Sequence, residues 1–248
     1  MINDLALVLP AAGRGSRFAK NGINEPKPLV ELNGRPFFWW AVESVRRVVK
    51  LREIVFVVLE EHIVDFSIDK KIKHYYPDAT IVAIPEVTSG AAETAKIGLA
   101  ALQTAGPVAI NDCDHAFVCQ SLPKILEALH DDIEGALMCF RSADPAYSYV
   151  KFGSQKQIVG TVEKQVASSF AIAGCYIFAD SSRFNKFFEQ YKKECPYNEL
   201  FISGIFNLIA QDHSRIGMLE LDYHCSFGTP DELSKISKEI FAPFLAWK

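Results

Sequence analysis

Short apolar runs alternate with amphipathic stretches along roughly the first half of the chain. Each run is rich in Leu or β-branched residues, which is typical of strands buried on both faces of a parallel sheet. The runs predict strands at Leu5–Leu9, Ile54–Leu59, Thr80–Ile84, Pro107–Asn111 and Gly135–Phe140. Helices are predicted at residues 37–49, 65–75, 91–101 and 121–129. We therefore expect an α/β fold, a three-layer α/β/α Rossmann-like arrangement around a mixed, mostly parallel sheet.

The apolar segments in the second part of the chain are shorter and lie closer together. Shorter apolar segments predict strands at Tyr149–Phe152, Ile158–Glu163 and Ala171–Phe178, with Gly153-Ser154 as a turn signal. These strands predict a small antiparallel extension that covers an acceptor as a lid. Helices recur at residues 184–191, 199–209 and 230–242. Because no Pro/Gly/Ser-rich linker or internal repeat interrupts the chain, we expect one domain over residues 1–248.

The charge and composition of the chain indicate what kind of molecule it binds. The 248 residues carry a net charge of −4, which argues against a nucleic-acid or membrane-surface binder. No apolar run approaches the ~20 residues of a membrane span, and the first residues do not resemble a signal peptide. The six cysteines lack CxxC pairs and indicate reduced thiols. We expect a cytoplasmic protein with a small-molecule partner, and its oligomeric state stays open.

A Gly-rich, doubly basic loop follows the first predicted strand and reads Ala-Ala-Gly-Arg-Gly-Ser-Arg-Phe up to Phe18. Pro26-Lys27-Pro28 follows shortly after. Glycines let backbone N–H groups approach phosphate oxygens, and the basic side chains neutralise several charges, so the loop suits a nucleoside triphosphate. It has neither the Walker spacing nor a complete dinucleotide fingerprint. Its place at the carboxyl end of a strand is where ligands bind in open α/β sheets.

Asp112-Cys113-Asp114 ends the predicted strand Pro107–Asn111 and brings carboxylates to the same sheet edge. Carboxylate oxygens are hard ligands that suit Mg²⁺, which bridges protein and phosphates. An Asp-x-Asp pair after a strand is also common as a purely structural feature. Next to a triphosphate loop, metal binding is the favoured interpretation.

The combined pattern Leu-Pro-Ala-Ala-Gly-x-Gly-Ser-Arg-Phe with Pro-Lys-Pro-Leu downstream resembles the signature of sugar-phosphate nucleotidyltransferases, also called nucleotide-sugar pyrophosphorylases. The resemblance continues in the family's order at residues 111–115, 162–164, 173–178 and 227–233, so it covers nearly the full chain. Segments 144–150 and 201–203 resemble short members tied to bacterial capsule and surface-polysaccharide synthesis. The implied reaction is attack of a sugar phosphate, or another small phosphorylated acceptor, on the α-phosphorus of a nucleoside triphosphate, releasing pyrophosphate.

The resemblance also implies roles for individual residues. Arg17 would neutralise the departing pyrophosphate, and Lys27 would lie at the α-phosphate. The nucleotide would be bound by Ala11, Ala12, Gly13, Arg14, Gly15, Ser16, Glu86, Ser89, Gly90 and Ala91. Asp114 would hold Mg²⁺, whereas Asp112 would point to the opposite side of an extended chain and support the site or cap a helix.

On the acceptor side, the resemblance implies that Glu163 bonds hydroxyls and Lys164 holds the acceptor's phosphate. In isolation these two residues would be interpreted as an ordinary surface ion pair. Gly174 in the next predicted strand would permit close approach of the acceptor to the backbone.

One position departs from the family pattern. Family members commonly carry an aspartate two residues before Gly-Thr-Pro, and this chain has Ser226 there. A serine hydroxyl or a water can complete octahedral Mg²⁺, and Asp222 or His224 are alternative ligands. Whether one or two ions take part is left open.

The base of the nucleotide would lie near Glu86. A carboxylate accepts from the exocyclic amine of cytosine but repels the carbonyl of uracil or thymine, which mildly favours CTP over UTP, dTTP and GTP. The alternative is that Glu86 is a solvated loop residue.

Two other function classes remain at this stage. A glycosyltransferase of the GT-A type would use Asp112-Cys113-Asp114 as its Asp-x-Asp motif but would not need both Arg17 and Lys27. A non-catalytic nucleotide-binding protein is suggested by Ser226. Pyrophosphate release separates the nucleotidyltransferase from both.

Overall fold

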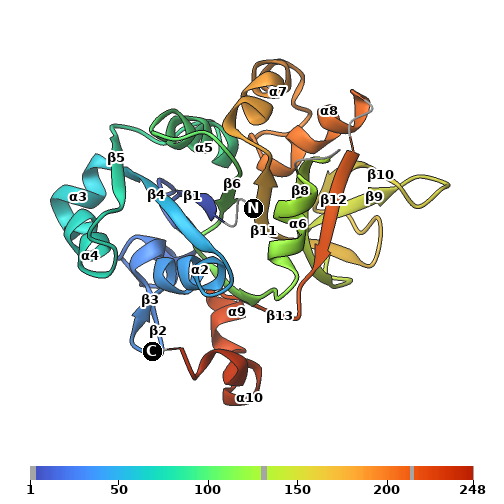
Figure 1. The fold of residues 1–248 in the computed structure, drawn as a ribbon. Helices are drawn as coiled ribbons and strands as arrows, with labels where there is room; N and C mark the ends of the chain where they lie inside the picture. Colours follow the sequence, from blue (N-terminus) through green and yellow to red (C-terminus); the bar gives the residue numbers. More distant parts are fainter. Residues whose placement is uncertain (1–3, 130–132, 213–214, 248) are drawn as a thin grey trace.

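The computed structural model describes residues 4–129, 133–212 and 215–247 (Figure 1). Met1 to Asn3, on which the signal-peptide interpretation depends, lie outside these ranges. A nine-stranded sheet forms the centre of the described chain. Its strands are β1 (Asp4–Pro10), β4 (Lys50–Leu59), β5 (Thr80–Ile84), β6 (Val108–Asn111), β8 (Ile133–Arg141), β9 (Ser148–Phe152), β10 (Ile158–Glu163), β11 (Phe170–Phe178) and β12 (Arg215–Glu220).

Strand pairing confirms the mixed, mostly parallel sheet on its N-terminal side. β1 lies between β6 and β4 and is parallel to both, and β4 is parallel to β5. β11 is antiparallel to β6 and to β8, and β12 returns parallel to β8. β9 and β10 form the expected antiparallel extension beside β11. The carboxyl ends of β1 and β6 therefore meet the antiparallel extension at one edge.

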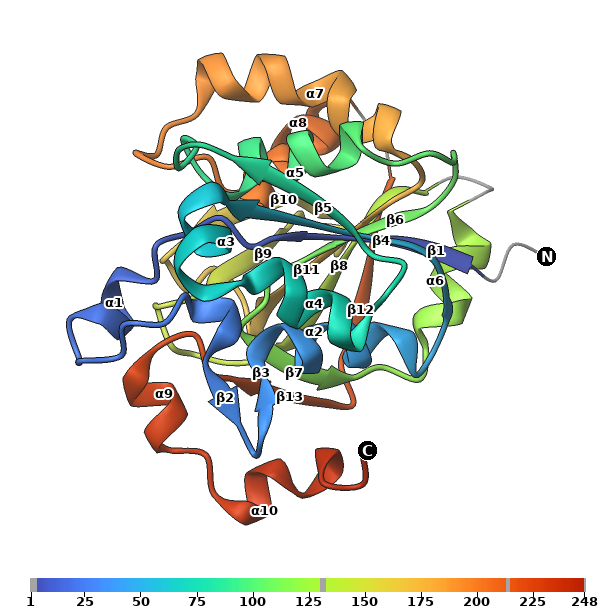
Figure 2. The same cartoon turned by 90° about the vertical axis from the view of Figure 1, so that its left-hand side faces the viewer.

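Helices cover both faces of the sheet, as Figure 2 shows edge-on. α5 (Ala91–Ala100), α7 (Ser181–Glu194) and α8 (Ile205–Gln211) lie on one face, and α2 (Phe37–Arg46) and α4 (Ile68–Tyr75) lie on the other. The side chains of β1 alternate accordingly. Leu5, Leu7 and Leu9 enter the core beneath α2, whereas Ala6 and Val8 enter the core beneath α5. This alternation produces the predicted three layers.

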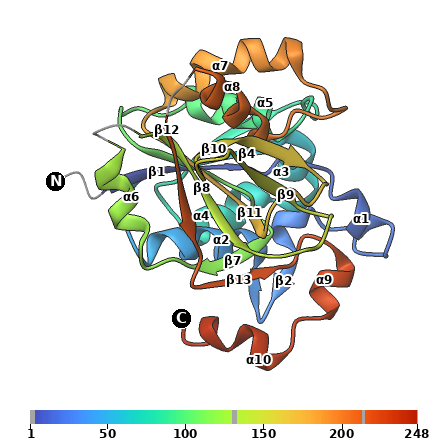
Figure 3. The same cartoon turned by 90° about the vertical axis from the view of Figure 1, so that its right-hand side faces the viewer.

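The remaining elements are short. The helices are α1 (Ser16–Ala19), α3 (Glu60–Phe66), α6 (Leu122–Ala128), α9 (Pro230–Ser234) and α10 (Lys238–Phe241), with 3₁₀ turns η1 (Lys27–Leu29), η2 (Ile202–Gly204) and η3 (Ala242–Phe244). Two small sheets pair β2 (Glu31–Leu32) with β3 (Arg35–Pro36) and β7 (His115–Val118) with β13 (Tyr223–Ser226). Figure 3 shows β7 and β13 beside the large sheet, leading to α9. None of the helices in the described ranges has the length and apolar character that a membrane crossing needs.

Most predicted helices differ from the structure only in their bounds, but three are broken or begin late. The helix expected at 65–75 is two helices, because Ser67 has a left-handed backbone with φ of 52°. The helix expected at 199–209 begins only at Ile202, with η2. The helix expected at 230–242 is broken between α9 and α10, where Ser237 caps the second helix by accepting from Ile240 N. The extended start of the 199–209 segment has a direct consequence for the site.

Candidate active site

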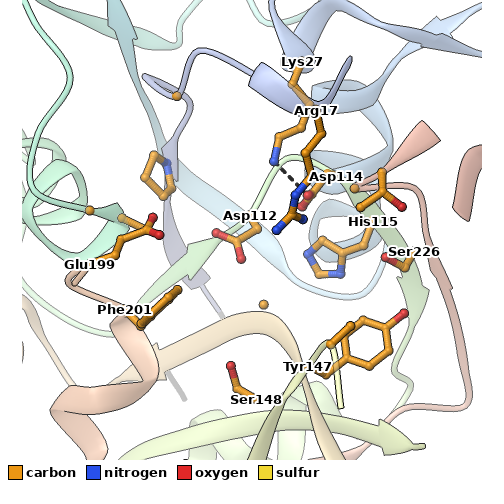
Figure 4. A pocket seen from close by; sticks show the side chains of 18 of the residues that line it. Arg17, Lys27, Asp112, Asp114, His115, Tyr147, Ser148, Glu199, Phe201 and Ser226 are labelled. Atoms are coloured by element: carbon orange, nitrogen blue, oxygen red, sulfur yellow. Dashed lines mark hydrogen bonds and ion pairs between the residues drawn. The ribbon is translucent and has the colours of Figure 1, made fainter. Parts of the chain in front are cut away.

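A pocket of about 570 Å³ opens where the carboxyl ends of β1 and β6 meet β9 and β10 (Figure 4). Predicted site residues from widely separated segments line it together. They are Ala12, Gly13, Gly15, Ser16, Arg17, Lys27, Gly90, Ala91, Asp112, Asp114, Glu163, Lys164, Gly174 and Ser226. The pocket therefore combines the Gly-rich loop at residues 11–18, called the phosphate loop below, with the Asp-x-Asp segment, the Glu-Lys pair and the segment before Gly-Thr-Pro.

The phosphate loop is fixed by backbone geometry and by one buried ring. Gly15 has φ of 59°, and its carbonyl accepts from the N–H groups of Phe18 and Ala19. A Cβ at this glycine would lie 3.2 Å from Lys27 Cβ, so a larger residue would be both strained and crowded. Phe18 is fully buried, and its ring meets that of Phe37 edge-to-face with 5.8 Å between the ring centres. The loop is thus held against the start of α2.

Lys27 lies between two prolines at the start of η1 and points across the pocket. Its Nζ donates to Asp114 Oδ2 at 2.8 Å. Burial lowers the pKa of Lys27, but the nearby negative charges, Asp114 first, and the hydrogen bond to Asp114 together outweigh it, so the pKa is raised overall. Burial raises the pKa of Asp114, but the charge of Lys27 and the hydrogen bond from it, with smaller contributions from His115 and the backbone, together bring it below its ordinary value. Both groups are therefore charged at neutral pH.

Asp112 lines the same pocket instead of turning away from it. The segment Asp112–Asp114 is bent and not extended, so both carboxylates reach the cavity. Figure 4 shows Asp112 between Asp114 and Glu199. Burial and the negative charge of Asp114 raise the pKa of Asp112 to about 7. Asp112 N also donates to Gly174 O at 2.9 Å, which joins the end of β6 to β11.

The half of the pocket that is expected to bind the acceptor is built on the antiparallel extension. Glu163 ends β10, and its carboxylate accepts from the hydroxyls of Ser148, at 2.7 Å, and Ser203. Burial raises the pKa of Glu163, although these hydroxyl bonds and the charge of Lys164 act in the opposite direction. Lys164 has a left-handed backbone with φ of 52°, a conformation that is strained for a non-glycine residue and occurs often at functional sites. Its Nζ lies 5.6 Å from the centre of the Phe201 ring.

The region around Ser226 is organised by the pairing of β13 with β7, which places Ser226 opposite His115. His115 Nε2 lies 2.9 Å from Asn111 Oδ1, and burial lowers the pKa of the ring to about 4. His224 lines the pocket and stacks on Phe140 at 3.9 Å. Asp222 instead accepts from Gln120 N and is not among the lining residues. Of the two alternative ligands named for Ser226, only His224 therefore reaches the pocket.

Four predicted nucleotide-binding residues are not among those that line the pocket. Ala11 is buried and donates from its N–H to Val57 O at 2.9 Å. Arg14 is exposed and pairs with Glu61 at 3.4 Å. Ser89 N donates to Glu93 Oε2, and Glu86 is exposed to solvent. The position of Glu86 favours its interpretation as a solvated loop residue and gives no support to the CTP preference.

Several lining residues were not singled out from the sequence: Thr88, Thr94, His115, Tyr147, Ser148, Glu199, Phe201 and Glu232. Glu199 and Phe201 lie in the extended segment that was expected to be helical. Tyr147 OH donates to Glu232 Oε1 at 2.7 Å, and both burial and this bond raise the pKa of Tyr147. Glu232 follows Gly-Thr-Pro by two residues, and that spacing was the only signal available in the sequence.

The described residues hold no ready-made group of three or more His, Cys, Asp or Glu side chains arranged around a metal position. Mg²⁺ does not need one, because it keeps several waters and is commonly bound through one or two carboxylates plus substrate phosphates. Asp114, ionised and directed into the pocket, is a donor of this kind. The residues present therefore fit Mg²⁺ bound together with a nucleotide.

Part of the sequence and the overall fold are similar to those of known proteins. An alignment 142 residues long, covering 53% of this chain and 34% of the relatives, shows 30% identity to the bifunctional enzyme IspD/IspF of two strains of Nitratidesulfovibrio vulgaris. The chain thus matches only about a third of their length. The fold is similar to that of a nucleoside-diphosphate-sugar pyrophosphorylase from Vibrio cholerae RC9, with a TM-score of 0.78, 23% identity and coverage of 92% and 98% of the two chains.

Two further solved structures share the fold. A putative glucose-1-phosphate thymidylyltransferase from Bacillus anthracis has a TM-score of 0.73 at 19% identity, covering 94% and 93% of the two chains. The inositol-1-phosphate CTP transferase from T. maritima also has a TM-score of 0.73, at 15% identity, covering 97% and 94%. Residues 6–169, more than half of the chain, match the family described as MobA-like NTP transferase domain. With its phosphate loop, Lys27 and Asp114 in one pocket, the chain belongs to this family and is a nucleotidyltransferase.

Proposed function

We propose that this protein transfers the nucleotidyl group of a nucleoside triphosphate to a sugar phosphate or another small phosphorylated acceptor. An acceptor phosphate oxygen forms a bond to the α-phosphorus. The bond from that phosphorus to the bridging oxygen breaks, and pyrophosphate leaves with the electron pair. The acceptor phosphate is already an anion at neutral pH, so the reaction depends on alignment and charge neutralisation more than on a general base.

The observation that carries the proposal is the arrangement of charge on two walls of one pocket. One wall, formed by the phosphate loop and the end of β6, carries Arg17, Lys27 and Asp114. The facing wall carries Ser148 and Glu163, which are joined by a hydrogen bond. In the proposed reaction Arg17 neutralises the pyrophosphate, and Lys27 binds the α-phosphate. On the facing wall, Lys164 holds the acceptor's phosphate and Glu163 binds its polar groups.

A magnesium ion would be held by Asp114 together with the phosphates, and it would supply charge stabilisation at the phosphoryl oxygens. The protein's own part is to orient both substrates. Lys27 Nζ donates a hydrogen bond to Asp114 Oδ2 at 2.8 Å, so both side chains are held in position before substrates bind. The carboxylate of Glu163 is likewise oriented by the hydroxyls of Ser148 and Ser203.

For the nucleotide we propose CTP first. The T. maritima neighbour is a CTP transferase, whereas the B. anthracis neighbour is described as a thymidylyltransferase, so dTTP, UTP and GTP belong in the same test. We further propose that the protein acts in the cytoplasm and that the product is used in surface-polysaccharide synthesis. A sugar phosphate is the first acceptor class because the V. cholerae structure carries the name of a nucleotide-sugar pyrophosphorylase.

The test combines each of CTP, UTP, dTTP, GTP and ATP with a panel of phosphorylated acceptors and Mg²⁺. Pyrophosphate release, with a new phosphodiester linkage in the ³¹P spectrum, is the expected result for one pairing. Transfer or hydrolysis of ready-made nucleotide sugars without pyrophosphate release would favour a glycosyltransferase instead. Nucleotide binding without turnover across the whole panel would favour a non-catalytic nucleotide-binding protein.

A further inference from the structure

Ser226 leaves the metal side of the pocket one carboxylate short, but another carboxylate lies close by. Glu232 is in α9, shortly after Gly-Thr-Pro, and lines the pocket. Its Oε1 accepts from Tyr147 OH at 2.7 Å, and its Oε2 accepts from Thr229 Oγ1 at 3.1 Å. A carboxylate offers about four acceptor positions, so two hydroxyl bonds orient Glu232 without using its capacity.

Gly228 marks the place where this carboxylate and Asp114 face each other. A Cβ built on Gly228 would lie 2.4 Å from Asp114 Oδ2 and 3.5 Å from Glu232 Oε2. The two carboxylates therefore flank one small space, which any side chain at position 228 would enter. Phe227 N donates to Asp114 O at 2.9 Å and holds the glycine beside Asp114.

A separate observation points to a bound group at the same place. His115, next to Asp114 in the chain, is 3% exposed and lines the pocket. Asn111 Nδ2 donates to Ala41 O, so Asn111 Oδ1 is the atom that accepts from His115 Nε2. His115 Nδ1 is buried beside the Asp112 backbone and makes no hydrogen bond of ordinary geometry within the described chain. Such orphaned groups are rare, and a water on a hydrated cation beside Asp114 is the kind of donor that this nitrogen lacks.

We propose that Glu232 supplies the second carboxylate of the metal site, in place of the aspartate that resembling enzymes carry at the position of Ser226. The hydrogen bonds from Tyr147 and Thr229 then orient a metal ligand, as partners behind ligating carboxylates commonly do. The ordinary alternative is that Glu232 only completes the cap of α9 and accepts from Tyr147. The inference rests on the proposed function for the presence of a metal ion, but not for the identity of nucleotide or acceptor.

The test measures Mn²⁺ binding, by electron paramagnetic resonance and calorimetry, to the full chain alone and with CTP. Glu232→Gln keeps an oxygen that accepts from Tyr147 but removes the charge. We expect this substitution to weaken Mn²⁺ binding by at least about tenfold. Even mutation of a residue that only hydrogen-bonds to a metal ligand commonly lowers metal affinity by about 10–100-fold. The matched control is Asp231→Asn on the same turn, whose side chain is 73% exposed and pairs with Lys235. This control should change Mn²⁺ binding by less than about twofold.

Ser226→Asp supplies a second, independent measurement. It should tighten Mn²⁺ binding more in the Glu232→Gln background than in the wild-type chain, because only there does it replace a lost ligand. Equal gains in both backgrounds would overturn the proposal, as would unchanged binding in folded Glu232→Gln or an equal loss in Asp231→Asn. If Glu232→Gln does not fold, Glu232→Asp takes its place and should show a smaller loss. Failure of turnover with every acceptor, with Mn²⁺ binding still dependent on Glu232, would reject the proposed function and leave this inference standing.

Discussion

Lys27 Nζ lies 2.8 Å from Asp114 Oδ2 and joins the phosphate loop to the end of β6. The two side chains come from segments 87 residues apart, and each holds the other in its charged form. The cation expected at the α-phosphate and the carboxylate expected on the metal are thus positioned by the same contact. Loss of either residue should therefore disturb both functions.

Replacing Lys27 with Met should lower turnover by about 10²–10³-fold, if the loss of one preorganised charge resembles the loss of an oxyanion-hole donor. The pKa of Asp114 should also rise, because the Lys27 charge is what lowers it. Steady-state kinetics measure the first effect. A thermal unfolding scan checks that the fold is intact, and turnover close to that of the wild-type protein would remove Lys27 from the site.

The two arginines of the phosphate loop provide a matched pair. Arg17 lines the pocket, whereas the Arg14 side chain is 65% exposed and pairs with Glu61 outside it. Arg17→Ala should reduce kcat/KM for the triphosphate by about 10²-fold, as expected for loss of a charge-assisted contact to phosphate. Arg14→Ala should stay within about threefold, since exposed ion pairs contribute little. Similar losses in both variants would show that only the net charge of the loop matters.

Glu163→Gln should act on the acceptor and not on the triphosphate. The amide can still accept from Ser148 and Ser203, so the pocket wall should keep its shape, but the negative charge is lost. We expect kcat/KM for the acceptor to fall by about 10–100-fold, the usual range for a hydrogen bond to a charged group. The KM for the triphosphate in the same assays is the internal control. A selective effect on that KM would place Glu163 in the nucleotide half.

The turn before α5 should contribute stability that depends on pH. The Lys192 ammonium and Ser89 N both donate to Glu93 and lower its pKa from 4.5 to about 2. A carboxylate whose pKa is lower in the folded than in the unfolded chain stabilises the fold at pH values above its unfolded-state pKa. This contribution is lost as the pH falls through the folded-state pKa. The difference in unfolding free energy between wild type and Glu93→Gln should be constant above about pH 5.5 and shrink towards pH 2. Urea titrations across this range measure it, and a difference that does not change with pH would contradict the assignment.

Much of the fold is predictable because it is encoded locally. The buried strands of the parallel part are continuous apolar runs. In β1, Leu5, Leu7 and Leu9 pack into the apolar core on one face of the sheet, and Ala6 and Val8 pack into the core on the other face. β7 and β13 were missed because each has only four residues and is stabilised by pairing across about a hundred residues of sequence. Helix boundaries were less accurate, since the breaks at Ser67 and before Ser237 depend on single backbone conformations and caps.

The site was predictable to the extent that motifs carry it. Arg17, Lys27, Asp114, Glu163 and Lys164 line one pocket, as the resemblance implies. The direction of a side chain within a loop was not predictable from its neighbours. Arg14 and Glu86 turn to solvent, although each lies close in sequence to residues that line the pocket. Glu232 lay within the resembling segment 227–233 but was given no role, because its place beside Asp114 comes from the folding of the chain.

Phe37 has a ring on either side of it. Its ring lies 5.8 Å from Phe18 in the phosphate loop and 4.5 Å from Phe227, the neighbour of Gly228. The ring of Phe37 thus packs against both sides of the pocket, the one proposed to bind the triphosphate and the one proposed to bind the metal ion. A change in the volume of this ring would move both sides at once, so attempts to redesign nucleotide preference should treat the three phenylalanines as a single unit.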